Sequence, residues 1–461
     1  MPPCQPSSPF DSLPVEILEQ ILVLCTTNAY PLANLTLRRV SKLWLEVSES
    51  SPRIWQHIFL DDRCTIASAH VHATMWAHKS YPMPFDVHLH VSQSSDLILP
   101  LLSPILPQLS RWRTFTMAGK RTESTQISNS FAQGIDGLII DIQDPDQFDP
   151  GEPEDVQSHL TFTSTTGWTS MNIWVSEIPS TMYFAPLHFT TLIMTEYSVS
   201  IFTQPRTVLG FLTICPMLEE FHFSGLQHDD ERLLTPLPMA YLPYLRVLHL
   251  HLTCGTRSLL SSIDAPTLVE LRLSHLNVDF QLASAIAERG SPRWEDGDSD
   301  DEANDFSRSK FSDHATGMGL RCLLRRSNPP LKILTMDWAD MRTKDFTFVF
   351  SHVQTLETFF IEASDMSDKV IELLRPYVVT PNERPTVRLP RLSSLELSNC
   401  HELSGDALLS VLSERIRLTD KHDWDGETLQ ELTIKGCDGF LPSHAALLRR
   451  DFRQRLRLGE N

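Results

Sequence analysis

The sequence predicts a mixed α/β fold in which a small helical module precedes a long series of strand–helix units. Near the start of the chain, apolar residues recur at the spacing of amphipathic helices. Downstream of residue 100, a short apolar pattern recurs, and helix-like stretches separate several of its copies. Repeated strand–helix pairs favour a parallel sheet, because neighbouring parallel strands need a crossover connection.

The N-terminal module is expected to contain two helices. Ser12 can cap the first, and Pro14 suits its first turn, where the missing N–H costs nothing. A second helix is expected over residues 35–47, and Asn28 and Pro31 interrupt the chain between the two. The apolar positions at helical spacing are Leu13, Ile17, Leu18, Ile21, Leu22, Leu24, Leu37, Val40, Leu43, Trp44 and Val47.

Three blocks of this module resemble an F-box: Leu-Pro-Val-Glu-Ile-Leu from Leu13, Val-Ser-Lys-Leu-Trp from Val40, and the tryptophan at position 55. Members of that family bind a Skp-type adaptor, which joins them to a cullin ubiquitin ligase. A plain helical cap on a larger domain is the alternative interpretation. The adaptor-binding residues that the resemblance implies are Leu13, Pro14, Ile17, Leu18, Ile21, Val40, Lys42, Trp44 and Trp55.

The recurring pattern is an apolar residue, two residues, a second apolar residue, one residue and a third apolar residue. Each copy predicts a short strand whose apolar side chains share one face. One such strand cannot bury its own apolar face, but stacked neighbours can. The copies begin at Phe189, Leu218, Leu245, Leu268, Leu331, Leu356, Leu392 and Leu429, with a looser copy at Trp112.

Most copies are spaced near the leucine-rich-repeat period of about 20–29 residues, or modestly further apart. We therefore expect a leucine-rich-repeat-like βα solenoid with a curved parallel sheet, and an irregular α/β domain is the alternative. The layout resembles F-box proteins with degenerate leucine-rich repeats, which are abundant in mushroom-forming fungi. Helices are expected at 67–78, 367–374 and 406–416, and a strand at 84–90.

These expectations divide the chain into successive parts. Two acidic stretches interrupt the pattern and predict a surface loop at 141–155 and a disordered insertion at about 293–312. The parts are a disordered N-terminus at 1–10, an F-box-like module at 11–60, a connecting segment with the first strands at 61–110, the repeats at 111–445, and a C-terminal helix or tail at 446–461.

Composition narrows the possible partners and compartment. The net charge of −19 argues against a nucleic-acid or anionic-membrane surface. Eight cysteines without a CxxC pair indicate reduced thiols rather than a disulfide framework. The sequence shows no apolar run long enough for a transmembrane helix and no secretory signal, so we expect a cytoplasmic or nuclear location.

No catalytic motif is evident, since GxSxG, HExxH, GxGxxG and Walker patterns do not occur. No cysteine or carboxylate accompanies the histidines between residues 70 and 90 at ligand spacing, so we interpret them as structural. We expect no cofactor, no metal and no enzymatic activity, and a hydrolase with dispersed catalytic residues is a minor alternative.

Recognition of a protein target is the function expected of the repeats. Alternate side chains of the predicted strands would form outward rows that mix acids, bases and aromatic rings, which suits a protein epitope. The chain would then select substrates for a cullin ligase, and the alternative is a leucine-rich-repeat scaffold without a ubiquitin-ligase role. The candidate substrate-binding residues are His222, His249, Arg272, Phe360 and Glu396 in one row, with Asp337 and Glu362 in the next.

Overall fold

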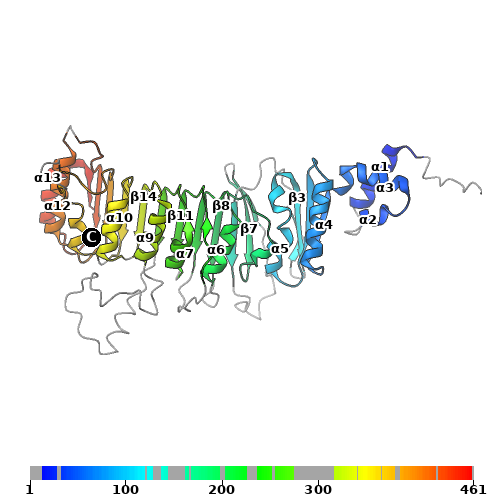
Figure 1. Ribbon diagram of the computed structural model, residues 1–461, viewed down its shortest axis with the longest axis horizontal. Helices are drawn as coiled ribbons and strands as arrows, with labels where there is room; N and C mark the ends of the chain where they lie inside the picture. The colour runs from blue at the N-terminus through cyan, green and yellow to red at the C-terminus, as the bar shows by residue number, and fades with distance from the viewer. Residues whose placement is uncertain are drawn as a thin grey trace, which may run out of the picture. The chain divides into compact units, whose positions relative to one another are not determined.

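The chain divides into two compact units, Met1–Phe189 and Thr190–Asn461. Figure 1 shows their helices and strands. The expectations for residues 1–10 and for the acidic insertion at 293–312 lie outside the described residues. The computed structural model describes residues 13–27, 33–119, 122–127, 137–143, 161–165, 168–197, 203–225, 236–251, 255–274, 316–339, 341–364, 366–378, 385–421 and 424–458.

The first unit begins with short helices. The carbonyl of Pro14 accepts hydrogen bonds from the next turn, so this proline starts the first helix as expected. The second expected helix is in fact two helices separated by a turn at residues 38–40. The break occurs because Ser41 caps a new helix, accepting a hydrogen bond from the Trp44 N–H at 3.3 Å. These helices are α1 (Val15–Thr27), α2 (Ala33–Leu37), α3 (Lys42–Ser50) and the 3₁₀-helix η2 (Pro52–Trp55).

A four-stranded sheet follows in the order β1-β2-β3-β4, with the first three strands parallel and the fourth antiparallel. The expected helix at 67–78 and strand at 84–90 are confirmed as α4 and β2. Residue 60, the expected end of the helical module, lies inside β1. The elements are β1 (His57–Asp61), α4 (Ile66–Lys79), β2 (Phe85–His90), η3 (Ser95–Leu97), α5 (Ile98–Leu102), η4 (Leu106–Arg111), β3 (Trp112–Gly119) and β4 (Thr122–Ile127).

Three further strands complete the described part of the first unit. β5 (Gly137–Ile142) runs parallel to β7 (Trp168–Val175), which pairs antiparallel with β6 (Thr161–Thr165). The loop expected from residue 141 therefore begins later than predicted, because Asp141 belongs to β5 and is buried. The buried apolar residues Leu138, Ile140 and Ile142 extend the strand through this acidic position.

The second unit is built on a large parallel sheet. The second and third apolar residues of all eight copies downstream of residue 188 lie on its strands, and each neighbouring pair of strands runs parallel. A last strand, β18, follows the C-terminal helix. In spatial order the strands are β18 (Leu456–Leu458), β17 (Glu431–Lys435), β16 (Ser394–Ser398), β15 (Thr358–Glu362), β14 (Ile333–Asp337), β13 (Glu270–Ser274), β11 (Val247–His251), β9 (Glu220–Ser224) and β8 (Thr191–Glu196).

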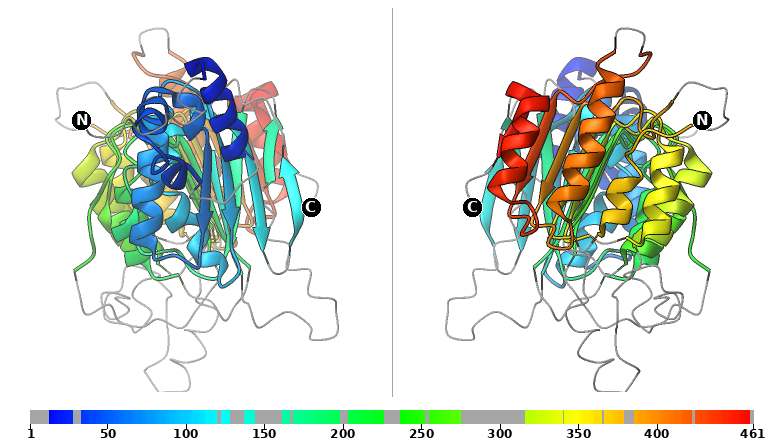
Figure 2. Two further views of the ribbon diagram at one scale, coloured as in Figure 1. Left: turned by 90° about the vertical axis from the view of Figure 1, so that its right-hand side faces the viewer. Right: turned by 90° about the vertical axis from the view of Figure 1, so that its left-hand side faces the viewer.

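Helices of the second unit cover one face of this sheet (Figure 2). Successive helices contact one another and form a layer, and the expected helices at 367–374 and 406–416 are confirmed as α11 and α12. A short parallel ladder joins β10 (Ala240–Tyr241) to β12 (Ile263–Asp264). The helices are α6 (Pro205–Thr213), α7 (Thr256–Ser262), α9 (Thr316–Ser327), α10 (Thr343–His352), α11 (Asp368–Glu372), α12 (Gly405–Thr419) and α13 (Pro442–Phe452).

The core of the second unit lies between this sheet and its helices. Along most strands, buried residues alternate with half-exposed ones, because successive side chains point to opposite faces. The buried positions are in register across the strands, as with Leu248, Leu271 and Leu334. Each buried leucine stabilises the fold by roughly 1.5–3 kcal/mol. The other face of the strands, which no helix in the described part of the unit covers, carries the half-exposed residues.

Candidate functional site

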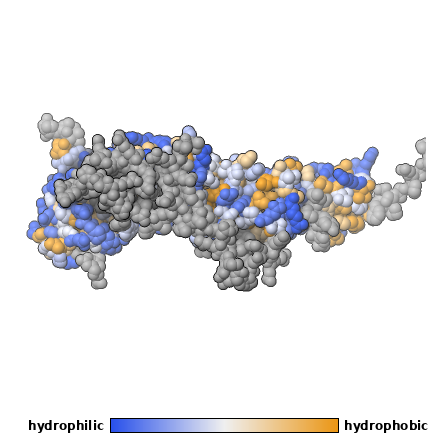
Figure 3. All heavy atoms as spheres, turned by 90° about the horizontal axis from the view of Figure 1, so that it is seen from below, coloured by the Kyte–Doolittle hydropathy of each residue, from blue (hydrophilic) through white to orange (hydrophobic). Residues whose placement is uncertain are grey.

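The N-terminal helices, α1 to η2, expose several large apolar side chains. Leu24 is 67% exposed and Val40 is 58% exposed. Figure 3 shows hydrophobic residues on the surface of this module, which is drawn on the right of the view as in Figure 1. Several exposed large apolar side chains on one small module are typical of an interaction site, because leaving them in water is unfavourable. The exposed apolar residues of the module are Val15, Ile17, Leu24, Val40 and Leu45.

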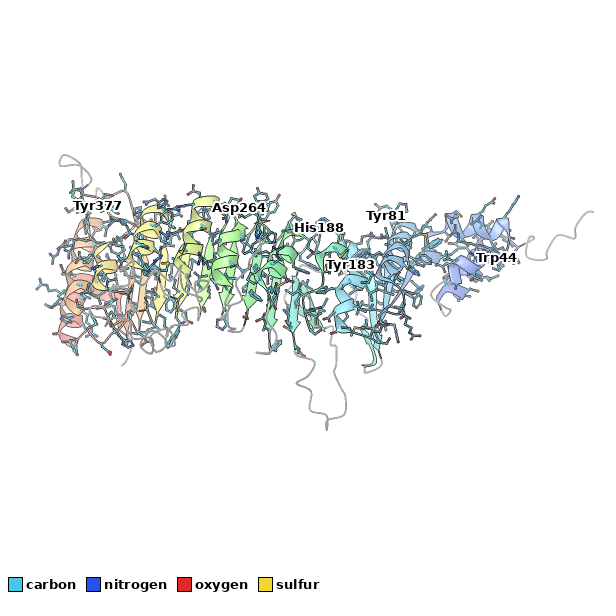
Figure 4. All side chains as sticks on the ribbon, turned by 60° about the horizontal axis from the view of Figure 1, so that its bottom comes forward. Trp44, Tyr81, Tyr183, His188, Asp264 and Tyr377 are labelled. Carbon is cyan, nitrogen blue, oxygen red and sulfur yellow. The ribbon has the colours of Figure 1, made fainter. Side chains whose placement is uncertain are left out.

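Most of the predicted adaptor-binding residues reach the module's surface. Pro14, Ile17, Val40 and Lys42 are exposed, and Leu13, Ile21 and Trp44 are partly exposed. Figure 4 labels Trp44 on α3.

Leu18 and Trp55 do not fit the prediction, because both are fully buried in this chain. The indole N–H of Trp55 donates a hydrogen bond to the Ser48 carbonyl at 2.7 Å. Its ring also packs edge-on against Trp76 of α4, with the ring centroids 4.9 Å apart. Leu18 and Trp55 therefore hold the module together and would not contact a partner.

The exposed residues Val15, Leu24 and Leu45 were missed as contact candidates. Leu24 belongs to the same helical stripe as Ile17 and Ile21, so the sequence did contain a signal for it. Val15 and Leu45 lie off that stripe, and only the fold shows that nothing in the described part of the chain covers them.

The module is fixed to α4 within the first unit. Arg38 and Lys79 lie over the Trp55 ring, 5.7 and 6.0 Å from its centroid. Glu49 on α3 forms ion pairs with both cations. Residues from the module and from α4 thus enclose the same tryptophan. Removing residues 1–60 would uncover Trp76 and would also remove β1.

The predicted target-binding residues lie on the sheet face of the second unit that none of the described helices covers, called the helix-free face below. His249 is the register partner of both His222 and Arg272 on the neighbouring strands. Phe360 pairs in the same way with Glu396, and Asp337 with Glu362. Adjacent strands lie about 4.8 Å apart, so each row forms a continuous line of side chains. The structure therefore places all seven in the two predicted rows, with Thr335 between Arg272 and Phe360 in the first row.

A histidine–carboxylate cluster stands at one end of the first row. The Nε2 atom of His249 lies 3.0 Å from the Glu270 Oε1 atom, and the Arg272 Nε–H donates to the same oxygen at 2.6 Å. The His222 ring meets the His249 ring edge-on, with centroids 4.3 Å apart. Sequence reasoning missed Glu270. It is the first residue of β13, and the row formed by the first residue of each strand was not considered.

The cluster shifts the titration of its members. Burial lowers the pKa of His222 to about 4, and the neighbouring His249 and Arg272 act in the same direction, against Glu270. Burial also lowers the pKa of His249, although its bond to Glu270 opposes the shift. For Glu270, burial is outweighed by His249 and Arg272, which lower the pKa of the carboxyl group. At neutral pH both imidazoles are neutral and can each donate and accept one hydrogen bond.

The opposite end of the face carries paired charges. The Lys435 ammonium lies 2.7 Å from a Glu396 carboxylate oxygen, and the Asn399 amide donates to Glu362 at 3.3 Å. The half-exposed ring of Phe360 lies beside Glu396 in the first row. This mixture of acids, bases and an aromatic ring suits a polypeptide better than a polyanion.

One histidine of the first unit meets carboxylates that the sequence did not place beside it. Possible ligand atoms of Asp61, Asp62 and His90 lie within 4.8 Å of one another. Asp61 and His90 are register partners on β1 and β2, a relation that sequence spacing cannot show. However, the Asp62 carboxylate already accepts hydrogen bonds from the backbone N–H groups of Ser92 and Gln93. Its evident role is to hold the turn after β2.

Comparison with known proteins adds no assignment. No protein-family model matches the chain, and no curated protein matches it in sequence. Within the described segments, no helix combines the length and the apolar character that crossing a bilayer requires.

Proposed function

We propose that this chain is a substrate-recognition subunit of an SCF-type cullin ubiquitin ligase. The N-terminal module would bind a Skp-type adaptor, and the helix-free sheet face would bind a protein target. The observation that carries the proposal is the exposure of the apolar side chains Val15, Ile17, Leu24, Val40 and Leu45 on a module whose sequence resembles an F-box.

Burial of this surface would drive adaptor binding. A fully buried large apolar side chain contributes roughly 1.5–3 kcal/mol. Several such side chains can offset the loss of translational and rotational freedom on association, about 4–15 kcal/mol. Lys42, exposed at the start of α3, adds a positive charge to the same module.

The sheet face would act by positioning. We interpret the second unit as a divergent leucine-rich-repeat-like βα solenoid, because its strands carry the repeated pattern in register and its helices cover one face. A target held on the open face would have its lysines at high effective concentration near the ubiquitin-charged enzyme. The chain itself would make and break no bonds.

Adaptor binding tests the proposal directly. Ile17→Asp combined with Val40→Asp places two charges on the exposed apolar surface. We expect this double variant of the full chain to bind a purified Skp-type adaptor at least about 100-fold more weakly than the wild type, measured by titration calorimetry. Leu447→Asp is the matched control, because Leu447 is 50% exposed on α13 of the second unit.

Two results would contradict the proposal. One is a wild-type chain that is folded by circular dichroism and does not bind the adaptor. The other is an equal loss of binding in the control variant. The packing of Trp55 on Trp76 favours one competing function in that case. The module would then be a structural cap, and the chain a non-enzymatic leucine-rich-repeat scaffold.

A further inference from the structure

Two cysteines occupy equivalent positions on neighbouring strands of the second unit. Cys400 lies two residues after the end of β16, and Cys437 lies two residues after the end of β17. Asn399 and Gly436 immediately precede them, and both adopt positive φ, 53° and 57°. The same left-handed turn therefore follows both β16 and β17. The Asn399 N–H ties the two turns together by donating to the Lys435 carbonyl at 2.8 Å.

The two thiols are buried and face the same segment. Cys400 is fully buried and Cys437 is 7% exposed. The Cys437 sulfur lies 3.4 Å from the Lys435 carbonyl oxygen and 3.8 Å from that of Leu397 on the neighbouring strand. It therefore lies against the segment that carries Cys400. Neighbouring strands are about 4.8 Å apart, which falls in the usual Cα separation of about 4.4–6.8 Å for a disulfide.

The environment makes the two thiols unequal. Interaction with the Cys400 thiol lowers the pKa of Cys437 despite burial. The Cys400 backbone and His401 act in the same direction, and Asp438 opposes them. The same interaction, with burial, raises the pKa of Cys400. A lowered pKa gives Cys437 a larger thiolate fraction at pH 7 than an ordinary thiol of pKa about 8.5. The isolated Cys215 differs, because burial raises its pKa to about 12.

We propose that Cys437 and Cys400 form an oxidation-sensitive pair that hydroperoxides convert to a reversible disulfide. The Cys437 thiolate attacks one peroxide oxygen and the O–O bond breaks, which gives a sulfenic acid and releases hydroxide. The Cys400 sulfur then attacks the Cys437 sulfur, and the sulfenic oxygen leaves as water with the Cys400 proton. In total, two thiols and one hydrogen peroxide yield one disulfide and two waters.

The bond would act beside the candidate target-binding face. It would join the turns that follow β16 and β17, and these strands carry Glu396 and Lys435 on the open face. Oxidation would therefore fix the spacing of this charged pair. The inference stands without the ubiquitin-ligase proposal, because it depends only on the two turns.

Peptide mass spectrometry of the oxidised full chain tests the pair. The reduced protein is treated with hydrogen peroxide at pH 7, quenched with acid, alkylated in denaturant and digested with trypsin without reductant. The two cysteines fall in separate peptides, residues 392–415 and 436–449. We expect these peptides to appear linked, two hydrogens lighter than their sum, and to separate after treatment with dithiothreitol. The Cys215 peptide should remain alkylated under the same conditions.

Two variants separate the roles of the thiols. In Cys400→Ser, we expect Cys437 to stop at the sulfenic acid and to be trapped by dimedone at least about ten-fold more than Cys215. In the matched variant Cys215→Ser, the linked peptides should form as in the wild type. The proposal is overturned if the wild-type chain yields no linked peptides at peroxide levels that oxidise the exposed Cys64. That result needs no variant and so does not depend on a variant's folding.

Discussion

The N-terminal module and the helix-free sheet face expose opposite kinds of surface. On the module, Ile17, Leu24 and Val40 are apolar and extend into solvent. On the sheet face, Glu270 and Glu396 hold positively charged or imidazole partners at 2.6–3.0 Å. Covering an apolar surface with any complementary apolar surface lowers the free energy of the system. Paired charges must instead exchange one partner for another, which changes the free energy little. The contrast suits one constant partner at the module and selective partners at the sheet.

Within the module, buried and exposed residues should respond differently to truncation. Trp55→Ala removes a fully buried ring that packs on Trp76, and we expect the free energy of unfolding to fall by about 3–5 kcal/mol. Urea denaturation followed by circular dichroism measures this loss.

Ile17→Ala is the control for this comparison, because Ile17 is 43% exposed. Its free energy of unfolding should change by no more than about 0.5 kcal/mol. Equal losses in the two variants would mean that the exposed apolar surface belongs to the module's own core, and the comparison of surfaces would fail.

On the sheet face, the low pKa of His222 should make the free energy of unfolding fall as the pH is lowered. Its pKa is about 4 in the folded chain and 6.5 in the absence of burial. Below pH 6.5 the unfolded chain takes up a proton that the folded chain does not, so stability falls as the pH drops toward 4. His222→Asn should remove this contribution. Between pH 7 and pH 4, we expect the wild type to lose about 1–3 kcal/mol more than the variant.

Denaturation curves for both chains at the two pH values measure this difference. His249, Glu220, Glu270 and Arg272 are present in both, so their own titration largely cancels. The same pH dependence in wild type and variant would show that His222 is not coupled to folding.

The smallest effect is expected for the charged pair at the other end of the face. Lys435→Met removes a cation that is half-exposed to solvent in its pair with Glu396. The free energy of unfolding should change by no more than about 0.5–1 kcal/mol, since solvent screens such pairs. Thermal denaturation at low and high salt provides the measurement. A loss above 2 kcal/mol would assign the face a structural role rather than a recognition role.

Sequence reasoning was most successful where the pattern was local and repeated. The leucines at 245, 248 and 250 predicted a strand by themselves, and their neighbours predicted its register, because equal parallel strands align. The two rows of candidate residues followed from that register. The resemblance to an F-box indicated which residues to consider, but it did not show that Leu18 and Trp55 are buried.

The remaining differences come from contacts between distant residues. Asp61 meets His90 only because β1 and β2 pair. Glu270 on β13 contacts His249 on the neighbouring strand β11. The break in the second helix had a local signal in Ser41, but the apolar spacing of residues 35–47 continues through it. Periodicity identifies the face that a helix buries, and capping decides where the helix begins.

The contact between Trp55 and Trp76 also limits how the N-terminal module could be transplanted. A module joined to its neighbour by a tether could be grafted onto another protein by cutting the chain after Trp55. Here Trp76 and Lys79 lie against Trp55, and Lys79 also pairs with Glu49, so such a cut would separate side chains that contact one another. An engineer who wishes to reuse this module would need to transfer residues 13–79 together, α4 included.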